Sequence, residues 1–395
     1  MFKYTLLIPL LIIFAIGAEG GAFLHSQPQK ETAKHSKELQ HSDNVLLDNK
    51  IEDIGAFVQE NIRENHVFYG LASYYNNVNH YIVSNEELVY FEEGASITLK
   101  QHQWLAAVGR FNVLLIKVNG LTVHLLDTGM VINNPSLLYR PDAVVKSVTK
   151  PELPEVASDL NDIRYAHLWA PFASLAKLIE MSLVSIQRNI SSSWGVTLVI
   201  FTVLLKIILL PFGMLTVRFQ RSVSQVQAKL APQLADIKKN YNGEEAHDRL
   251  MAAHKRMGVT PFYSLKPMLG TFFQIPVLIA TFNALGEMPQ FAGQSFLWIK
   301  DLAYPDAIAS LRFSIPIFGD TINLLPFVMT AVTLFSTAIF KNPHAPGAEV
   351  QFQKRNLYLM SAAFFVLFYP FPAVMVLFWA LANILHTFQQ QIIKI

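Results

Sequence analysis

The sequence contains no cysteine, which limits the chemistry that the chain can perform. A structural disulfide, a thiolate metal site and a lipid-modified cysteine are all excluded. Charge is also scarce, because Asp, Glu, Lys and Arg make up 15% of the residues, whereas about 25% is usual in soluble domains. Hydrophobic residues, by contrast, make up 52%. This composition favours a membrane protein.

Hydropathy divides the 395 residues into predicted regions. We expect an N-terminal anchor at 1–23, an extracytoplasmic (periplasmic) domain at 24–165, an interfacial helix at 166–191 and an apolar core at 192–395, which contains a cytoplasmic hairpin at 218–257. The first apolar run, Tyr4–Ala18, follows Lys3 and fits either a cleaved signal peptide or a short uncleaved anchor. We favour the anchor, because a cytoplasmic start agrees with the charge pattern of the rest of the chain.

The extracytoplasmic region is predicted to be a small, mainly β domain. Apolar residues at helical spacing first indicate a helix between Leu47 and Ile62. Short β-rich runs then predict strands at 81–83, 88–91, 97–99, 112–118 and 121–126. Asn119-Gly120 separates the last two runs and suits a two-residue turn, so we expect a hairpin there. His124 and Asp127 have no accompanying nucleophile or metal-ligand spacing, and we interpret them as solvated strand residues.

A segment of mixed polarity follows at Leu168–Ile190. Its apolar residues alternate with Lys177, Glu180 and Arg188, and Trp169 stands near its start. This pattern is typical of an amphipathic helix that lies in the headgroup region of a membrane. The alternative is an ordinary helix packed on the β domain.

Lys206 lies near the middle of an apolar stretch, Trp194–Val217, that is long enough to cross a bilayer. A charge at mid-membrane costs about 2.5–3.5 kcal/mol on insertion scales, and such residues usually face a protein interior or a wet cavity. Thr202 lies one helical turn before Lys206, and Pro211 follows it. An interaction inside the protein must therefore offset the cost of placing Lys206 in the membrane.

Further apolar runs predict the remaining spans, at 262–285, 321–340, 357–369 and 371–389, which with the anchor give six. The run at 357–369 is shorter than the roughly 20 residues of a full span, and Pro370 after it indicates a tight helical hairpin with the last run. Asn283, Glu287 and Asn323 lie near span ends, and we interpret them as interfacial.

Basic residues predict the orientation of these spans. They are concentrated in Arg218–Arg256 and Lys341–Arg355, whereas the loop at 286–320 carries only Lys300 and Arg312. The positive-inside rule therefore places the first two segments and the C-terminus in the cytoplasm. The β domain and the loop at 286–320 are then expected outside.

The segment Arg218–Met257 has an apolar stripe of its own. Apolar residues recur in steps of three and four, and Asn242-Gly243 offers a reversal, which predicts a short antiparallel helical hairpin. Two interpretations of its basic surface remain open. It attracts anionic lipid headgroups, ribosomal RNA or a nascent chain, or its charges only set the topology.

Several short motifs occur in a fixed order along this core. They are Trp194-Gly195-Val196, Thr202 four residues before Lys206, Leu209-Leu210-Pro211 at the end of that span, Gln274-Ile275-Pro276, Phe296–Leu302, and Pro372–Trp379 with Asn383 and Gln389-Gln390. In order and spacing they resemble the motifs of YidC/Oxa-type membrane protein insertases. The resemblance extends from about Leu168 to the C-terminus.

The resemblance implies a polytopic α-helical membrane protein, with a five-helix insertase core, an N-terminal anchor and a small mainly β extracytoplasmic domain. In this family the core helices enclose a hydrophilic groove whose basic residue attracts a polar or acidic segment of the substrate. The apolar helix of the substrate then passes into the bilayer, with no enzymatic step, cofactor or metal. The implied groove residues are Lys206, Thr202, Gln274, Phe378 and Trp379.

The same resemblance implies a chaperone-like role toward nascent membrane proteins in a bacterial, Gram-negative inner membrane, with both termini in the cytoplasm. The ribosome, the general secretory translocon and anionic lipids are further expected partners, and no specific nucleic acid is expected. Lys206 departs from the family's usual Arg, keeping the charge but losing the bidentate fork. Two other classes remain open: an envelope assembly or scaffold factor without insertion activity, and a small secondary transporter, for which we find no internal repeats.

Overall fold

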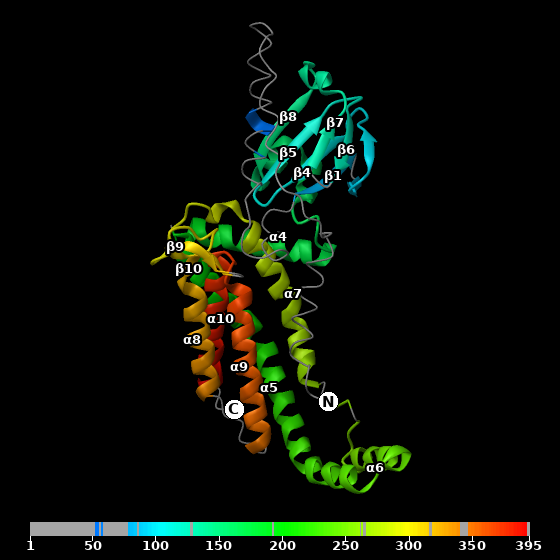
Figure 1. The fold of residues 1–395 in the computed structure, drawn as a ribbon, viewed down its shortest axis with the longest axis vertical. Helices are drawn as coiled ribbons and strands as arrows, with labels where there is room; N and C mark the ends of the chain where they lie inside the picture. Colours follow the sequence, from blue (N-terminus) through cyan, green and yellow to red (C-terminus); the bar gives the residue numbers. More distant parts are fainter. Residues whose placement is uncertain are drawn as a thin grey trace. The chain divides into compact units, whose positions relative to one another are not determined.

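The computed structural model describes residues 52–54, 57 and 78–392, except 85–86, 127–128, 192, 261, 264–265, 316–317 and 340–346. It divides into two compact units, one rich in strands and one helical (Figure 1). The β unit comprises the described residues up to Glu180 together with Asn283–Gln290, and the helical unit comprises Met181–Phe282 and the described residues from Phe291 onwards. The predicted anchor and most of the predicted helix at 47–62 lie outside the described residues.

The β unit is built on antiparallel strands in two sheets. The larger sheet has the order β2-β1-β4-β5-β8, and the smaller has the order β3-β6-β7. The strands are β1 (Asn79–Ser84), β2 (Glu87–Tyr90), β3 (Ser96–Thr98), β4 (Trp104–Val108), β5 (Asn112–Lys117), β6 (Thr122–Leu126), β7 (Gly129–Ile132) and β8 (Val144–Thr149). A mainly β region thus precedes the helical region, as the sequence predicted.

The hairpin predicted at Asn119-Gly120 is wrong, because the strands on either side of it belong to different sheets. β5 pairs with β4 and β8, whereas β6 pairs with β3 and β7. A two-residue type I′ turn needs positive φ at both positions, but in this pair only Gly120 has it, at 84°. The Gly120 N–H donates to the Leu99 carbonyl at 2.8 Å, and the Leu99 N–H donates to the Leu121 carbonyl at 2.8 Å. These bonds direct the chain toward β3 and into the smaller sheet.

Both faces of the larger sheet are buried, because side chains alternate between its two faces. Leu105 and Ile116 belong to a core shared with Val123 of the smaller sheet. Leu115 and Leu160 belong to the core on the opposite face. Short helices cover that face: η3 (Lys150–Glu152), α3 (Leu153–Val156) and η4 (Ser158–Ile163). A further short helix, η2 (Pro135–Tyr139), precedes β8.

The helical unit contains the long helices of the C-terminal region. They are the second half of α4 (Ala170–Asn189), α5 (Trp194–Asn240), α6 (Gly243–Arg256), most of α7 (Lys266–Glu287), α8 (Leu324–Ile339), α9 (Gly347–Phe368) and α10 (Ala373–Ile392). α8 packs against α9 and α10, and α10 also packs against α5 (Figure 1). Between α7 and α8 lie η6 (Pro289–Phe291) and the paired strands β9 (Ala307–Ile315) and β10 (Gly319–Asn323).

Helix boundaries differ from the predictions in three places. α5 does not end near Pro211 but runs through Pro211 and Pro232. The residues from Thr321 to Asn323, predicted as the start of a span, belong to β10. α9 begins at Gly347 and has 22 residues, so this helix is longer than its apolar run.

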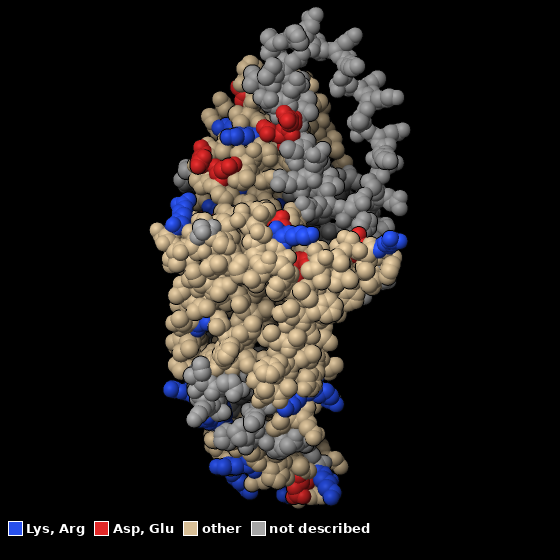
Figure 2. All heavy atoms as spheres, turned by 90° about the vertical axis from the view of Figure 1, so that its left-hand side faces the viewer, with Lys and Arg blue, Asp and Glu red and all other residues tan. Residues whose placement is uncertain are grey.

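The predicted antiparallel hairpin at 218–257 is confirmed. The second half of α5 packs on α6 around Val223, Leu230 and Ala253, and Asn242 and Gly243 lie at the reversal. On the face drawn in Figure 2, Lys and Arg gather at this end of the helical unit, whereas its middle carries few charged side chains.

Among the described residues, one helix is long and apolar enough to cross a membrane. It is the part of α5 at Trp194–Ile237. Two shorter apolar helices, Leu324–Ile339 and Ala373–Gln389, fall below that length. The six spans therefore stay a prediction.

Candidate functional site

The first half of α5 carries Lys206, the charged residue that the sequence singled out. Thr202 is 1% exposed, and its hydroxyl donates to the Leu198 carbonyl at 2.7 Å. This bond satisfies the hydroxyl within its own helix, so Thr202 does not need Lys206 as a partner. Lys206 lies one turn further on and is half-buried, while Ile207 and Ile208 beside it are more than 60% exposed. The helix therefore has a polar side at Lys206 and an open apolar side next to it.

Polar residues of α10 face the Lys206 side of α5. His386 lies close enough to Lys206 for the charges of the two groups to interact. Further along α5, a Cβ added to Gly213 would lie 3.0 Å from the Gln389 Nε2 atom. We call these four residues, Lys206, Gly213, His386 and Gln389, the polar seam. Sequence reasoning found Lys206 but did not place His386 or Gln389 beside it.

A hydroxyl pair continues this polar character to a third helix. The Ser336 Oγ of α8 and the Thr387 Oγ1 of α10 lie 2.6 Å apart, so one hydroxyl donates to the other. Hydroxyl bonds of this kind are a common link between helices in an apolar environment. α10 is therefore polar on the side of α5 and also on the side of α8.

The predicted aromatic residues lie in a packed cluster between α7, α9 and α10. Phe378 is 4% exposed, and its ring centroid lies 6.0 Å from that of Phe282. Trp379 lies 5.8 Å from Phe282, 5.3 Å from Phe364 and 5.4 Å from Phe368, measured between ring centroids. The rings of Phe378 and Trp379 thus pack against other aromatic rings.

Gln274, the last of the predicted groove residues, is half-buried on α7. Pro276 follows two residues later inside the helix and removes one backbone hydrogen bond there. The structure therefore places the five predicted residues on three helices, with Lys206 and Thr202 on α5, Phe378 and Trp379 on α10, and Gln274 on α7.

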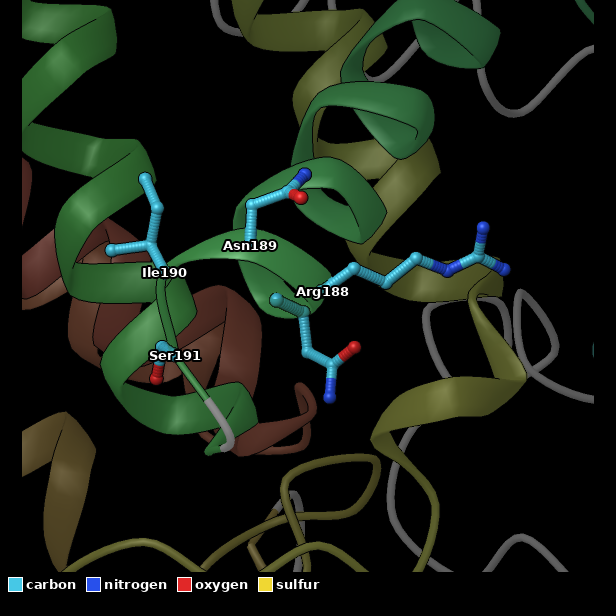
Figure 3. A pocket seen from close by; sticks show the side chains of 5 residues that line it. Arg188, Asn189, Ile190 and Ser191 are labelled. Atoms are coloured by element: carbon cyan, nitrogen blue, oxygen red, sulfur yellow. The ribbon is translucent and has the colours of Figure 1, made fainter.

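A shallow hollow lies away from these residues, at the junction of α4 and α5 (Figure 3). Its volume is about 390 Å³, and it is lined by Gln187, Arg188, Asn189, Ile190 and Ser191. The lining residues are consecutive in sequence and none is a predicted groove residue, so this hollow is the outer surface of a helix end. The described residues also contain no group of three or more His, Asp or Glu that could hold a metal ion.

Two residues interpreted as interfacial are in fact buried. Asn323 is 2% exposed and donates through Nδ2 to the Tyr369 carbonyl at 2.8 Å. Glu287 is 8% exposed, and its Oε2 atom lies 2.6 Å from the Lys150 Nζ atom. The partner of Glu287 lies 137 residues away in sequence, where no local pattern could reveal it.

An apolar helical bundle, a charge-bearing helix and the polar seam between α5 and α10 characterise the C-terminal region. Comparison with protein families matches residues 185–395, more than half of the chain, to the 60Kd inner membrane protein family. The chain belongs to this family, and the resemblance to YidC/Oxa-type insertases predicted from its motifs is confirmed.

Curated relatives agree with this membership. The chain is 31% identical over 230 residues to a membrane protein insertase YidC of Treponema denticola, a match that covers 57% of this chain and 38% of the relative. It is 31% identical over 222 residues to the YidC of Herminiimonas arsenicoxydans, which covers 56% of this chain and 37% of that protein. The chain thus spans well under half the length of these relatives.

A solved structure is also similar. It is titled "Active YidC insertase crystal structure with the first transmembrane domain resolved" and has 18% sequence identity and a TM-score of 0.36. The match covers 79% of this chain and 70% of the solved chain.

Proposed function

We propose that this protein is a membrane protein insertase, which moves polar segments of nascent membrane proteins into the bilayer and releases their apolar helices to the lipid. Membership of the 60Kd inner membrane protein family supports this proposal. The observation that carries it is Lys206, a half-buried cation on an apolar helix, beside the polar side of α10. A purely structural helix in an apolar bundle has no need of such a charge, because placing it there costs about 2.5–3.5 kcal/mol.

The proposed mechanism is electrostatic and involves no covalent step. Lys206 attracts an acidic or polar segment of the substrate, and the side chains of His386, Gln389 and Gln274 give that segment hydrogen-bonding partners. The exposed apolar side of α5 at Ile207 and Ile208 then offers the substrate's apolar helix a path to the lipid. Phe378 and Trp379 support the wall of the groove through the aromatic cluster.

The topology belongs to the same proposal. The chain would cross the inner membrane of a Gram-negative bacterium six times, with the anchor at 1–23, the β domain at 24–165 outside, an interfacial helix at 166–191 and a five-helix core at 192–395. Both termini and the basic hairpin at 218–257 would lie in the cytoplasm. There the hairpin would meet anionic lipids, the ribosome or the general secretory translocon.

Insertion into liposomes tests the proposal directly. The full chain is reconstituted alone, and a single-span substrate with a short acidic tail is added, with empty liposomes as the background. Wild type is compared with Lys206→Arg and Lys206→Leu, and with Lys229→Leu as a matched control, because Lys229 is an exposed lysine of the same helix.

The expected result is insertion by wild type, Lys206→Arg and Lys229→Leu, and loss of insertion in Lys206→Leu. Equal insertion by all variants would keep the insertase function but reject the role of Lys206. Wild-type insertion no greater than that of empty liposomes would reject the function and favour an assembly factor.

A further inference from the structure

A cluster of charged side chains in the β unit lies outside the proposed groove. Lys150 Nζ lies 2.6 Å from Glu287 Oε2, and both side chains are less than one-tenth exposed. His167 Nε2 lies 3.1 Å from Glu287 Oε1. The Arg110 Nε–H donates to the Gly286 carbonyl at 2.7 Å. We call Arg110, Lys150 and His167 with the last turn of α7 the clasp.

The fold brings the two long cationic side chains of the clasp to one end of the larger sheet. Arg110 lies in the turn between β4 and β5, and Lys150 follows β8, which pairs with β5. The Lys150 N–H donates to the Phe111 carbonyl at 2.9 Å, which holds the two segments side by side. Thr149 and Glu152 form a reciprocal capping box around this residue. Lys150 and Arg110 are therefore held by the sheet itself.

The last turn of α7 suits such cations. The carbonyls at a helix C-terminus lack partners within the helix, and the helix dipole is negative there. Arg110 satisfies one of these carbonyls, at Gly286. Glu287 adds a buried negative charge at the same end, where it is favourable only if a cation pairs with it. Burial raises the pKa of the Glu287 carboxyl, but Lys150, His167 and Arg110 lower it by more, so the pKa lies below its usual value.

A second ion pair fixes the segment that carries His167. Arg164 pairs with Glu180 of α4, and the Tyr165 hydroxyl donates to Glu180 at 3.0 Å. His167 Nε2 also lies 3.1 Å from Asn283 Oδ1, one turn before Glu287 on α7. The beginning of α4 and the end of α7 are thus bound by the same short segment of chain.

We propose that Lys150 and Arg110 are positioning residues for insertion, which grip the last turn of α7 and thereby set the position of the helix that carries Gln274. This inference rests on the proposed insertase function. α7 runs from Lys266 to Glu287 with Pro276 inside it, so Gln274 belongs to the same helix as the turn that the clasp holds. The β domain then affects insertion by positioning α7, and it does not contact the substrate.

The experiment uses the full chain in proteoliposomes with the single-span acidic-tail substrate. The variants are Lys150→Met, Glu287→Lys and the conservative Lys150→Arg. Lys146→Met is the matched control, because Lys146 is an exposed lysine on β8 of the same sheet. Insertion rates at several substrate concentrations are measured together with hydrogen exchange in α7 and in β4 and β5.

We expect Lys150→Met and Glu287→Lys to increase exchange at the end of α7 and to lower the maximal insertion rate roughly tenfold, the factor equivalent to 1.4 kcal/mol. Exchange in β4 and β5 should stay protected, which separates loss of the clasp from unfolding of the domain. Lys150→Arg and Lys146→Met should insert at a rate close to that of wild type.

Unchanged insertion in Lys150→Met, with increased exchange at the end of α7, would overturn the clasp while leaving the insertase function intact. A Lys150→Arg variant as defective as Lys150→Met would also overturn it, because a cation that can pair with Glu287 would then not restore the position of α7. A wild-type protein that does not insert would instead reject the insertase function on which the clasp depends.

Discussion

Trp298 donates its indole N–H to the Asp306 carboxylate at 3.0 Å, and the same Asp306 oxygen accepts the backbone N–H of Leu325 at 2.7 Å. Asp306 is 5% exposed, so its carboxylate is shielded from water, although Trp298 is 41% exposed. One carboxylate oxygen therefore joins the loop that carries Trp298 to the first turn of α8. There it satisfies a backbone N–H group that has no partner within the helix.

This arrangement predicts that Asp306→Ala destabilises the protein more than Asp306→Asn. Loss of a helix-capping acceptor costs about 0.5–2 kcal/mol. Burial raises the pKa of the Asp306 carboxyl above its usual value, so the site disfavours the negative charge. The acceptor oxygen of residue 306 therefore matters more for stability than its charge. Asn keeps such an oxygen, whereas Ala leaves the Leu325 N–H without it.

The free energy of unfolding, from denaturant titration of the full chain in mixed micelles, measures the difference. Asp320→Ala serves as the control, because Asp320 is an exposed acid of the same segment between α7 and α8. Equal losses for Asp306→Ala and Asp320→Ala would show that the cap contributes nothing.

Gly195 provides a steric prediction at the beginning of α5. A Cβ added at this position would overlap the Cβ and ring atoms of Phe296, so the glycine lets the loop approach the helix closely. We expect Gly195→Ala to cost about 1–3 kcal/mol, the usual penalty for overpacking. The free energy of unfolding in the same micelles measures this loss.

A second substitution tests the cause. Phe296→Ala removes the atoms that the new Cβ would meet, so Gly195→Ala should be almost neutral in that background. If Gly195→Ala lowers the free energy of unfolding equally in wild type and in Phe296→Ala, the loss does not come from contact with Phe296. The free-energy changes of substitutions that do not interact are additive.

Elements with local signals were predictable from the sequence. The apolar stripe at Val223 and Leu230 predicted the α5–α6 hairpin, because both partners of that core lie within one short segment. The apolar run around Lys206 predicted the first half of α5, but its end was missed, since the proline at Pro211 is accommodated within a continuous helix. The family followed from motif order along the whole core.

Features set by distant partners could not be predicted in this way. Asn119-Gly120 has the local chemistry of a hairpin turn, but the bonds to Leu99 direct the chain into another sheet. Glu287 resembled an interfacial residue because Lys150 is remote in sequence. No local pattern could bring His386 near Lys206, since that neighbourhood depends on how α10 packs on α5.

His80 predicts a dependence of β-domain stability on pH. It lies half-buried on β1, and burial lowers its pKa from 6.5 to about 4. In the unfolded chain the His80 imidazole is protonated as the pH falls through 6.5, whereas in the folded domain it is protonated only near pH 4. The contribution of His80 to the free energy of unfolding is therefore fully present above pH 6.5. It falls as the pH drops from 6.5 to about 4, because the unfolded state binds more protons in this range.

Hydrogen exchange in β1 and β4 of the full chain, at pH 7 and pH 5, measures this effect. The His80→Leu variant should lose less protection between the two pH values than wild type does. Carboxylates titrate in both proteins, so their contribution to the pH dependence is the same in the two and does not affect the difference. A pH dependence unchanged by His80→Leu would exclude His80 as the titrating group.

The neighbourhood of His386 and Lys206 gives a prediction for the groove itself. A carboxylate at position 386 would provide Lys206 with a counter-ion, and opposite charges near a protein surface attract by up to a few kcal/mol. An acidic substrate tail would then have to compete with that internal partner. We therefore expect His386→Glu to lower insertion of an acidic-tail substrate roughly tenfold, which corresponds to only 1.4 kcal/mol of this attraction. His386→Gln, which adds no charge, should insert at nearly the wild-type rate.

The substrate supplies the decisive control for this prediction. If the effect is competition for the Lys206 charge, a substrate with a neutral tail of the same length should insert equally well with wild type and with His386→Glu. The double variant His386→Glu with Lys206→Leu should be no worse than Lys206→Leu alone, since the cation for which both acids compete is then absent. A defect of His386→Glu that is equally large for acidic and neutral tails would show that the new carboxylate disturbs the packing of α10 on α5. Position 386 would then affect the packing of the bundle, and it would have no electrostatic interaction with Lys206.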